Sequence, residues 1–155
     1  MPKLTNLILI RDGNRILFAM KKRGFGAGRW NGFGGKVQPG ETMEEAAVRE
    51  TQEEGGITPK DVRRFAVLEF RFEGDPQDAQ AIDCHCFTTN AWDGEPVETE
   101  EMAPRWFSVD EIPFDDMWPD DRHWFPLFLA GKTFEGSFLF SQDQKTILHQ
   151  EIIER

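Results

Sequence analysis

Three acidic residues, Glu50, Glu53 and Glu54, recur at helical spacing near the end of a segment that has the pattern of a capped helix. At about 100° per residue they continue the face that starts at Met43 and that packing would reserve for apolar groups. Carboxylates on such a face are costly unless a positive group compensates them. A hard divalent cation meets this need, and Mg²⁺ is usual where phosphates complete the coordination. The spacing therefore favours a Mg²⁺ site, which Mn²⁺ could also occupy.

The same glutamates also fit a simpler interpretation, a solvated run of charge at a helix end. Glutamates close to a helix C-terminus oppose the helix macrodipole, so this interpretation leaves their position unexplained. Arg49 lies on the outward side of the helix and can compensate only part of the cluster. The helix by itself favours the metal site without excluding the solvated run.

A second group, Trp118-Pro119-Asp120-Asp121, combines an aromatic ring with two carboxyls. Tryptophan is a natural stacking surface for a base, and such stacking contributes about 1–3 kcal/mol in nucleic-acid sites. Adjacent carboxyls beside aromatic rings cannot both ionise cheaply, so one pKa should be raised and one group should stay protonated and able to donate. The alternatives are a core tryptophan and a helix N-cap with its first turn.

Lys21 and Lys36 flank a glycine-rich segment, residues 24–35, in which the backbone must approach other groups closely. Two cations there could bind phosphate within an otherwise acidic chain, although solvated surface lysines are the commoner case. Asn31 lies in the same segment, and its context by itself is that of a turn residue.

The elements that must position these residues follow from periodicity and capping. Thr42 opens a capping box with the glutamate three residues on, and Gly55-Gly56 stops this helix. Phe70 and Phe72 alternate onto one face of a strand, where they either line a pocket or pack in the core. Helices are predicted at 42–54 and 120–130, a turn at 74–76, and strands at 4–10, 15–21, 62–72, 81–89, 105–107, 134–140 and 146–153. This mixture predicts an α/β (α+β) sandwich, a curved mixed sheet with two flanking helices, as a single domain over residues 1–155.

Composition narrows the classes of function. Of the 155 residues, 39% are hydrophobic and 30% are charged, as in soluble globular proteins. No run of about 18 apolar residues could span a membrane, and the first residues lack the apolar stretch of a secretory signal, so we expect a cytoplasmic protein. The formal net charge of −10 argues against DNA or RNA as a partner. A small phosphorylated ligand fits if a metal or a local basic patch offsets the repulsion.

The two cysteines, Cys84 and Cys86, lie two residues apart in a strand-like segment. This spacing points both side chains to one face and does not suit a disulfide between them. We expect reduced, buried thiols, because a zinc site would need further ligands.

The residues around the glutamate helix form a longer pattern. Gly35 is followed after five residues by Glu41 and, after seven more, by the run Arg49-Glu50-Thr51-Gln52-Glu53-Glu54-Gly55-Gly56-Ile57. This pattern resembles the box of the Nudix hydrolases at every charged and glycine position. Thr51 departs from it, since the family usually has an aliphatic residue there, and its hydroxyl can bond back to the preceding turn at small cost. The resemblance implies a Nudix-type α/β/α sandwich and Mg²⁺-dependent cleavage of a phosphoanhydride bond.

The resemblance also implies roles for individual residues. The implied metal ligands are Gly34 (through its carbonyl), Glu50, Glu53, Glu54 and Glu101, and the implied catalytic residues are Arg49, Glu50, Glu53, Glu54 and Glu101. Arg49 would orient the glutamates through charge-assisted pairs, and Glu41 would brace the join between loop and helix. Glu101 would stand on the far side of the metal site as a ligand or base, with Glu98 and Glu100 as alternatives. The cation would neutralise phosphate oxygens and activate an attacking water.

One branch of the family is especially similar. Segments 21–37, 112–114, 116–121 and 124–127 resemble those of Nudix enzymes that hydrolyse oxidised purine nucleoside triphosphates. This implies conversion of substrates such as 8-oxo-dGTP or 2-hydroxy-dATP to a monophosphate and pyrophosphate, which sanitises the nucleotide pool. The implied substrate-binding residues are Asn6, Lys21, Asn31, Phe33, Gly34, Gly35, Lys36, Phe70, Phe72, Trp118, Pro119, Asp120 and Asp121.

Two departures from this branch leave base selectivity open. Asn6 stands where the relatives have a threonine, and the loop at 74–83 is longer. The alternatives are a Nudix hydrolase of methylated purine triphosphates or of another nucleoside diphosphate-X compound, and an inactive nucleotide sensor, which the intact glutamates argue against. We expect a monomer whose partner is a small-molecule nucleotide, with no nucleic acid polymer and no membrane.

Overall fold

The computed structural model describes residues 3–74 and 81–155. In chain order, the elements are β1 (Lys3–Asp12), β2 (Arg15–Lys21), β3 (Trp30–Asn31), α1 (Met43–Gly55), β4 (Thr58–Lys60), β5 (Arg63–Phe72), β6 (Ile82–Thr89), β7 (Ala91–Asp93), β8 (Met102–Ser108), the 3-10 turn η1 (Phe114–Asp116), α2 (Asp121–Leu129), β9 (Phe134–Phe140) and β10 (Ile147–Glu154). The turn predicted at 74–76 and most of the longer loop predicted at 74–83 lie outside the described residues.

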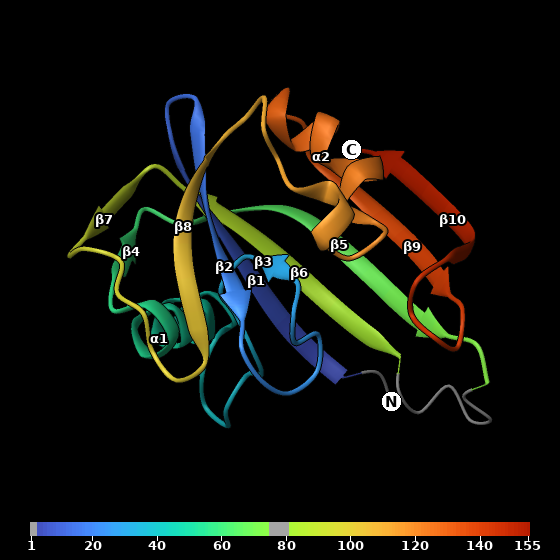
Figure 1. Cartoon of the computed structure of the whole chain (residues 1–155), viewed down its shortest axis with the longest axis horizontal. Coiled ribbons are helices and arrows are strands. Elements are labelled where there is room, and N and C mark those ends of the chain that lie inside the picture. Colours follow the sequence, from blue (N-terminus) through green and yellow to red (C-terminus); the bar gives the residue numbers. More distant parts are fainter. Residues whose placement is uncertain (1–2, 75–80) are drawn as a thin grey trace.

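A mixed sheet runs through the middle of the protein (Figure 1). Its strands lie in the order β10-β9-β5-β6-β1-β2-β3, and β8 also pairs with β2. β1 runs parallel to β6 and β5 runs parallel to β9, whereas the other pairs of this sheet are antiparallel. A small separate ladder joins β4 to β7, at the left of Figure 1. The mixed sheet and its two helices confirm the predicted α/β class.

The central strands divide the core into two clusters. Leu7 and Leu9 of β1 point to the cluster that contains the buried residues of α2. Ile8 and Ile10 point to the cluster that contains Ala47 of α1. Because successive strand residues face opposite sides, the two helices cover opposite faces of the sheet. This is the predicted sandwich of helix, sheet and helix.

α1 begins and ends where its capping residues predict. The Thr42 hydroxyl accepts the backbone N–H of Glu45 at 3.1 Å, and the Glu45 carboxylate accepts the N–H of Thr42 at 2.9 Å. Gly56 ends the helix at φ +74°, which favours glycine. Thr51 is fully buried, and its hydroxyl donates to the carbonyl of Ala47 at 2.6 Å. This is the bond predicted for the one departure from the Nudix box.

The start of α2 corrects one alternative. Asp120 has helical backbone angles, φ −71° and ψ −28°, and its side chain makes no capping hydrogen bond. Its carboxylate instead accepts the indole N–H of Trp124 at 2.7 Å. The interpretation of Asp120 as a capping side chain is therefore wrong, because a buried indole donor holds the carboxylate away from the helix N-terminus.

The remaining differences concern short elements. Within the described residues, β3, β4 and β7 were not predicted, because two or three residues carry no measurable hydrophobic period. β8 extends on both sides of the predicted strand 105–107 through its pairing with β2. Cys84 and Cys86 are buried and free, as predicted. No described helix is long and apolar enough to cross a membrane.

Candidate active site

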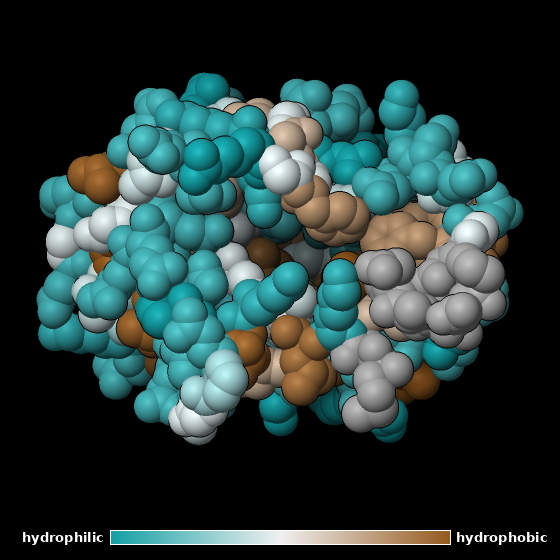
Figure 2. Space-filling model, turned by 90° about the horizontal axis from the view of Figure 1, so that it is seen from below, coloured by the Kyte–Doolittle hydropathy of each residue, from teal (hydrophilic) through white to brown (hydrophobic). Residues whose placement is uncertain are grey.

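A cavity of about 200 Å³ opens among the sheet, the glycine-rich segment and the start of α2. Figure 2 shows the molecule hollowed on the face seen from below, with hydrophobic residues inside the hollow and hydrophilic ones around much of it. The cavity lining includes Leu7, Leu68, Phe70, Phe72 and Cys84 from the strands, Phe25, Gly26, Asn31 and Gly34 from the glycine-rich segment, and Trp118, Asp120 and Asp121 from the start of α2. An apolar lining with a few polar groups is typical of a small-molecule site.

Trp118 forms an aromatic wall of this cavity. Its ring centroid lies 5.1 Å from that of Phe25, 6.5 Å from that of Phe72 and 5.7 Å from that of Phe140. A Cβ at Gly26 would lie 3.2 Å from the indole nitrogen, so glycine lets the backbone pass close to the ring. The wall is built from aromatic residues of four segments that lie far apart in the sequence.

Asp120 and Asp121 lie together in the cavity wall and are 2% and 5% exposed. Burial raises the pKa of Asp120 to about 6, although the indole N–H of Trp124 acts in the opposite direction. Burial also raises the pKa of Asp121 well above its ordinary value, and the charge of Asp120 adds to this effect. The sequence predicted one raised pKa, and both are raised. Burial therefore favours the protonated form of both carboxyls, and the charge of Asp120 favours it further in Asp121.

Glu54 of α1 lines the same cavity and is 9% exposed. Its Oε1 accepts the backbone N–H of Gly34 at 2.9 Å. Burial raises the pKa of Glu54 to about 7, the charge of Glu50 acts in the same direction, and the charge of Lys21 acts against both. The cavity thus joins a carboxyl pair beside an aromatic wall to a buried glutamate beside a lysine.

Arg49 connects the acidic residues of α1 to the preceding loop. Its Nε donates to Glu41 at 2.7 Å, and its Nη1 donates to Glu50 at 3.0 Å and to Glu53 at 3.3 Å. Its Nη2 also donates to the carbonyl of Lys36 at 3.1 Å. The hydrogen bond from Arg49 lowers the pKa of Glu41. These are the contacts that the sequence predicted for Arg49 and Glu41.

The chemistry of the α1 glutamates fits a hard divalent cation. A Cβ at Gly35 would lie 2.7 Å from the Cδ of Glu50, so glycine leaves room for this carboxylate. Burial raises the pKa of both Glu50 and Glu54 and so disfavours their ionised forms, which a bound cation would stabilise. Within residues 3–74 and 81–155, no three acidic, histidine or cysteine side chains converge on a complete metal centre. A cation here would need further oxygen ligands, which phosphate groups can supply.

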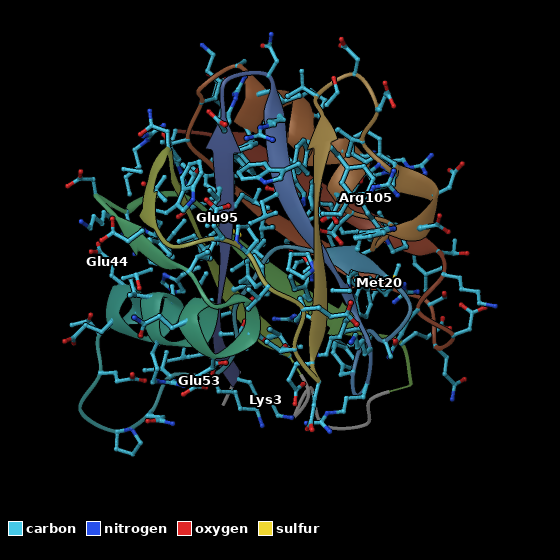
Figure 3. All side chains as sticks on the ribbon, turned by 60° about the vertical axis from the view of Figure 1, so that its left-hand side comes forward. Lys3, Met20, Glu44, Glu53, Glu95 and Arg105 are labelled. Carbon is cyan, nitrogen blue, oxygen red and sulfur yellow. The ribbon has the colours of Figure 1, made fainter. Side chains whose placement is uncertain are left out.

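Glu53 does not share the buried face predicted for it. Its side chain is 59% exposed, and Figure 3 shows it at the lower edge of α1. The buried face of α1 is centred on Ala47, Thr51 and Glu54. At about 100° per residue, Glu53 points well to one side of that face, which corrects the prediction. Its contact with Arg49 keeps it next to Glu50.

Glu101 lies near the cavity in an ion pair. Its carboxylate accepts hydrogen bonds from Arg23 Nη2 at 2.6 Å and Nε at 3.0 Å, and these bonds lower its pKa. Its charge acts on Glu54, and it feels the charge of the cavity residue Lys21. Glu101 is therefore within electrostatic reach of the glutamates but is not among the described residues that line the cavity.

Most predicted substrate-binding residues meet at the cavity, namely Asn6, Lys21, Asn31, Gly34, Gly35, Phe70, Phe72, Trp118, Asp120 and Asp121. Three do not. Phe33 is fully buried in the core on the α1 side, because it bridges Ile8, whose side chain faces α1. Lys36 is exposed, at the surface end of the loop. Pro119 lines a separate shallow groove, because the chain turns Trp118 and Asp120 inward on either side of it.

Several cavity residues were missed by the sequence analysis. Phe25 is exposed and packs on Trp118, and an aromatic residue among glycines was a signal for it. Met102 and Phe140 come from distant strands and had no local signal. Asn6 was predicted to bind substrate. Its side-chain nitrogen is buried without a hydrogen-bond partner among the described residues. An unpaired buried donor at a cavity is available to a ligand.

Comparison with known proteins agrees with this geometry. Residues 1–128 match the family described as NUDIX domain. The chain is 50% identical over 152 residues to the oxidized purine nucleoside triphosphate hydrolase of Mus musculus, which covers 98% of this chain and 95% of that protein. The protein of the same name from Danio rerio is 47% identical over 148 residues, with 96% and 93% covered. The MutT protein from Bacillus halodurans has a similar fold, with a TM-score of 0.86 at 23% identity and 97% of both chains covered. The chain belongs to the Nudix hydrolase family.

Proposed function

We propose that this Nudix hydrolase cleaves oxidised purine nucleoside triphosphates, such as 8-oxo-dGTP and 2-hydroxy-dATP, to a nucleoside monophosphate and pyrophosphate. The observation that carries the proposal is the pair of adjacent carboxyls, Asp120 and Asp121, which are buried with raised pKa values in the wall of a cavity that Trp118 also lines. The mouse and zebrafish relatives, whose names state hydrolysis of oxidised purine nucleoside triphosphates, support it.

Recognition of the base rests on stacking and on a movable proton. The purine stacks against Trp118, and its hydrogen-bonding edge meets the two aspartates. An ionised Asp120 accepts an N–H of the base, while a protonated Asp121 donates to a ring nitrogen or a keto oxygen. Because the proton can pass between adjacent carboxyls, the pair can match the different edges of oxidised guanine and oxidised adenine.

The triphosphate extends from the base toward Lys21 and the glutamates of α1. Lys21 offsets part of the phosphate charge in a chain whose formal net charge is −10. The backbone N–H of Gly34 fixes Oε1 of Glu54, and Arg49 holds Glu50 through a hydrogen bond of 3.0 Å. These contacts pre-position carboxylates on the side of the cavity that receives the phosphates.

Nudix hydrolases generally use divalent metal ions. We assign this role to Mg²⁺, with Mn²⁺ as a substitute, and its ligands to Glu50, Glu53, Glu54, the Gly34 carbonyl and Glu101. When bound, the cation supplies neutralisation of phosphate oxygens and activation of the attacking water. For Glu101 to take part, its carboxylate must exchange the ion pair with Arg23 for the metal site.

We place the enzyme in the cytoplasm as a monomer of one domain, residues 1–155, that acts on small-molecule nucleotides and on neither nucleic acid polymers nor membranes. The strands after residue 128 support a single domain, because β9 and β10 extend the same sheet through β5. The acidic net charge supports a small substrate, since a polyanion would be repelled.

A substrate panel tests the proposal. Oxidised, methylated and normal purine nucleoside triphosphates, together with nucleoside diphosphate-X compounds, are assayed with Mg²⁺ for kcat/KM. We expect the oxidised purines to give the highest values, with pyrophosphate and monophosphate as the products. A higher value for a methylated purine or a diphosphate-X compound would replace the proposed substrate. Orthophosphate as the primary product would contradict the proposed cleavage position.

A further inference from the structure

Arg29 contacts Trp118 without lining the cavity. Its guanidinium carbon lies 4.1 Å from the centroid of the Trp118 ring. Its Nη2 donates to the carbonyl of Gln144, in the turn between β9 and β10, at 2.9 Å. Arg29 is not among the described residues that line the cavity, whereas Trp118 is. One side chain thus ties the aromatic wall to the glycine-rich segment and to a distant turn.

Both anchors of this side chain are held by the backbone. The Arg29 carbonyl accepts the N–H of Lys21 at 3.1 Å, which closes the glycine-rich segment onto β2. Gln144 adopts φ +63°, and its turn is closed by the N–H of Ser141 donating to the carbonyl of Thr146 at 2.8 Å. The turn therefore presents the Gln144 carbonyl at a defined place, and the Arg29 side chain is held both at its backbone and at its guanidinium.

We propose that Arg29 is a positioning residue that holds Trp118 in place as the wall against which the purine stacks. The inference rests on the proposed function, because it assigns the base to this wall. A planar guanidinium can stack on an indole and, at the same time, donate to a carbonyl in its own plane. A lysine ammonium is a point charge and cannot do both in this geometry. Loss of Arg29 should therefore weaken base binding more than it slows the chemical step.

The charge of Arg29 has a second effect. Burial raises the pKa of Asp120 and of Asp121, and the Arg29 charge opposes this in both groups. The other groups that act on the pair are the thiols of Cys84 and Cys86 from β6, the indole N–H of Trp124 from α2 and the backbone N–H of Asp120. Removal of the guanidinium charge should therefore let the pair keep its proton to a higher pH.

The first experiment compares Arg29→Ala with Arg29→Lys and with a matched control, Arg15→Ala. The Arg15 guanidinium lies 4.2 Å from the centroid of Trp106, which is the same type of contact away from the cavity. Loss of a cation–π contact predicts that Arg29→Ala raises KM for 8-oxo-dGTP about threefold to thirtyfold. The value of kcat should stay within about twofold, the pattern of a lost binding interaction. Arg29→Lys should restore KM only in part, and Arg15→Ala should leave KM unchanged.

The second readout needs no activity. The indole N–H resonance of Trp118 is assigned by its loss in Trp118→Phe and is followed in the free protein. Arg29→Ala should move or broaden this resonance, while Arg15→Ala should leave it in place. An unmoved resonance together with a wild-type KM in Arg29→Ala would overturn the inference. If the resonance moves but the wild-type enzyme does not hydrolyse oxidised purines, the positioning role stands and the proposed function fails.

The pH dependence of kcat/KM distinguishes the effect of the Arg29 charge from the effect of its planar shape. Arg29→Gln keeps a planar donor without the charge, and Arg29→Lys keeps the charge without the plane. The upper limb of the kcat/KM profile should lie at higher pH in Arg29→Gln than in Arg29→Lys. Identical limbs in the two variants would show that the Arg29 charge does not reach the aspartate pair.

Discussion

The indole N–H of Trp124 donates to the carboxylate of Asp120 at 2.7 Å across one turn of α2. Trp124 is fully buried, and its ring packs against Phe65 and Phe134, each with centroids 5.9 Å apart. Asp120 lies in the cavity wall. The packing of the hydrophobic core thus determines the direction in which this carboxylate points.

Trp124→Phe should therefore affect both stability and protonation. A buried carboxyl that loses its partner costs about 1–3 kcal/mol, so we expect the free energy of unfolding in urea to fall by that amount. The pKa of Asp120 should rise further, because the indole N–H lowers it in the native protein. Trp106→Phe, which alters a ring packed on Trp92 outside the cavity, is the control for loss of an indole. Equal unfolding free energies for Trp124→Phe and the wild type would contradict this account.

Glu54→Gln tests the assignment of the buried glutamate. We expect kcat to fall at least about a hundredfold, as the loss of a metal-activation role should produce. EDTA should abolish turnover of the wild-type enzyme, and added Mg²⁺ should restore it. Glu44→Gln, on the exposed surface of the same helix, is the matched control and should retain full activity. Full turnover in EDTA would remove the metal from the proposed function.

Asn6→Leu tests the unpaired amide nitrogen in the cavity. The substitution removes a buried donor that has no partner within residues 3–74 and 81–155, but it also removes the oxygen that accepts the N–H of Gly35 at 3.3 Å. Because the two effects oppose each other, the free energy of unfolding should change by less than about 1 kcal/mol. If the nitrogen binds substrate, KM should rise about fivefold or more, the cost of one lost hydrogen bond. A wild-type KM would show that Asn6 serves only the loop.

The parts of the site that could be predicted are those carried by local patterns. One helix contains the capping box of Thr42, the stop at Gly56 and the spacing of Glu50 and Glu54. These features depend only on neighbouring residues, so they can be predicted from the sequence. Trp118 and the two aspartates lie within residues 118–121, so a shared role in ligand binding could be proposed from the sequence alone.

The parts that could not be predicted depend on contacts between distant segments. Met102 and Phe140 reach the cavity only through strand pairing across the sheet. Phe33 turns into the core because of its bridge to Ile8, which no local pattern encodes. The exposure of Glu53 could not be predicted either, because a run of charged residues does not reveal the width of the buried face of the helix.

The aspartate pair predicts unequal effects on different purines. Asp120→Asn and Asp121→Asn each fix one donor–acceptor pattern and remove the movable proton. A site built to hydrogen-bond its substrate is penalised by unpaired buried groups, so kcat/KM for oxidised purines should fall about tenfold or more. The loss should differ between oxidised guanine and oxidised adenine nucleotides within each variant. Wild-type rates for both variants on every purine would leave the substrate assignment resting on the relatives alone.

The same pair predicts how stability depends on pH. Burial raises the pKa of Asp120 to about 6 and that of Asp121 well above its ordinary value, whereas an aspartate in the unfolded chain titrates at about 4. The folded protein therefore holds protons that the unfolded chain has already released. The contribution of the pair to stability is fully present below about pH 4 and is lost as the pH rises through the folded pKa values.

Asp121→Asn tests this sign, because an amide keeps a donor for Asp120 but cannot lose a proton. As the pH rises above about 4, the free energy of unfolding of the wild type should fall more steeply than that of the variant, because only the wild type must ionise Asp121 in the folded state. Other groups with raised pKa values, such as Glu54, are present in both proteins and cancel in the difference. Urea titrations at intervals across the range measure both curves. Parallel curves would mean that Asp121 has the same pKa in the folded and unfolded protein, and the protonated member of the pair would then have to be Asp120.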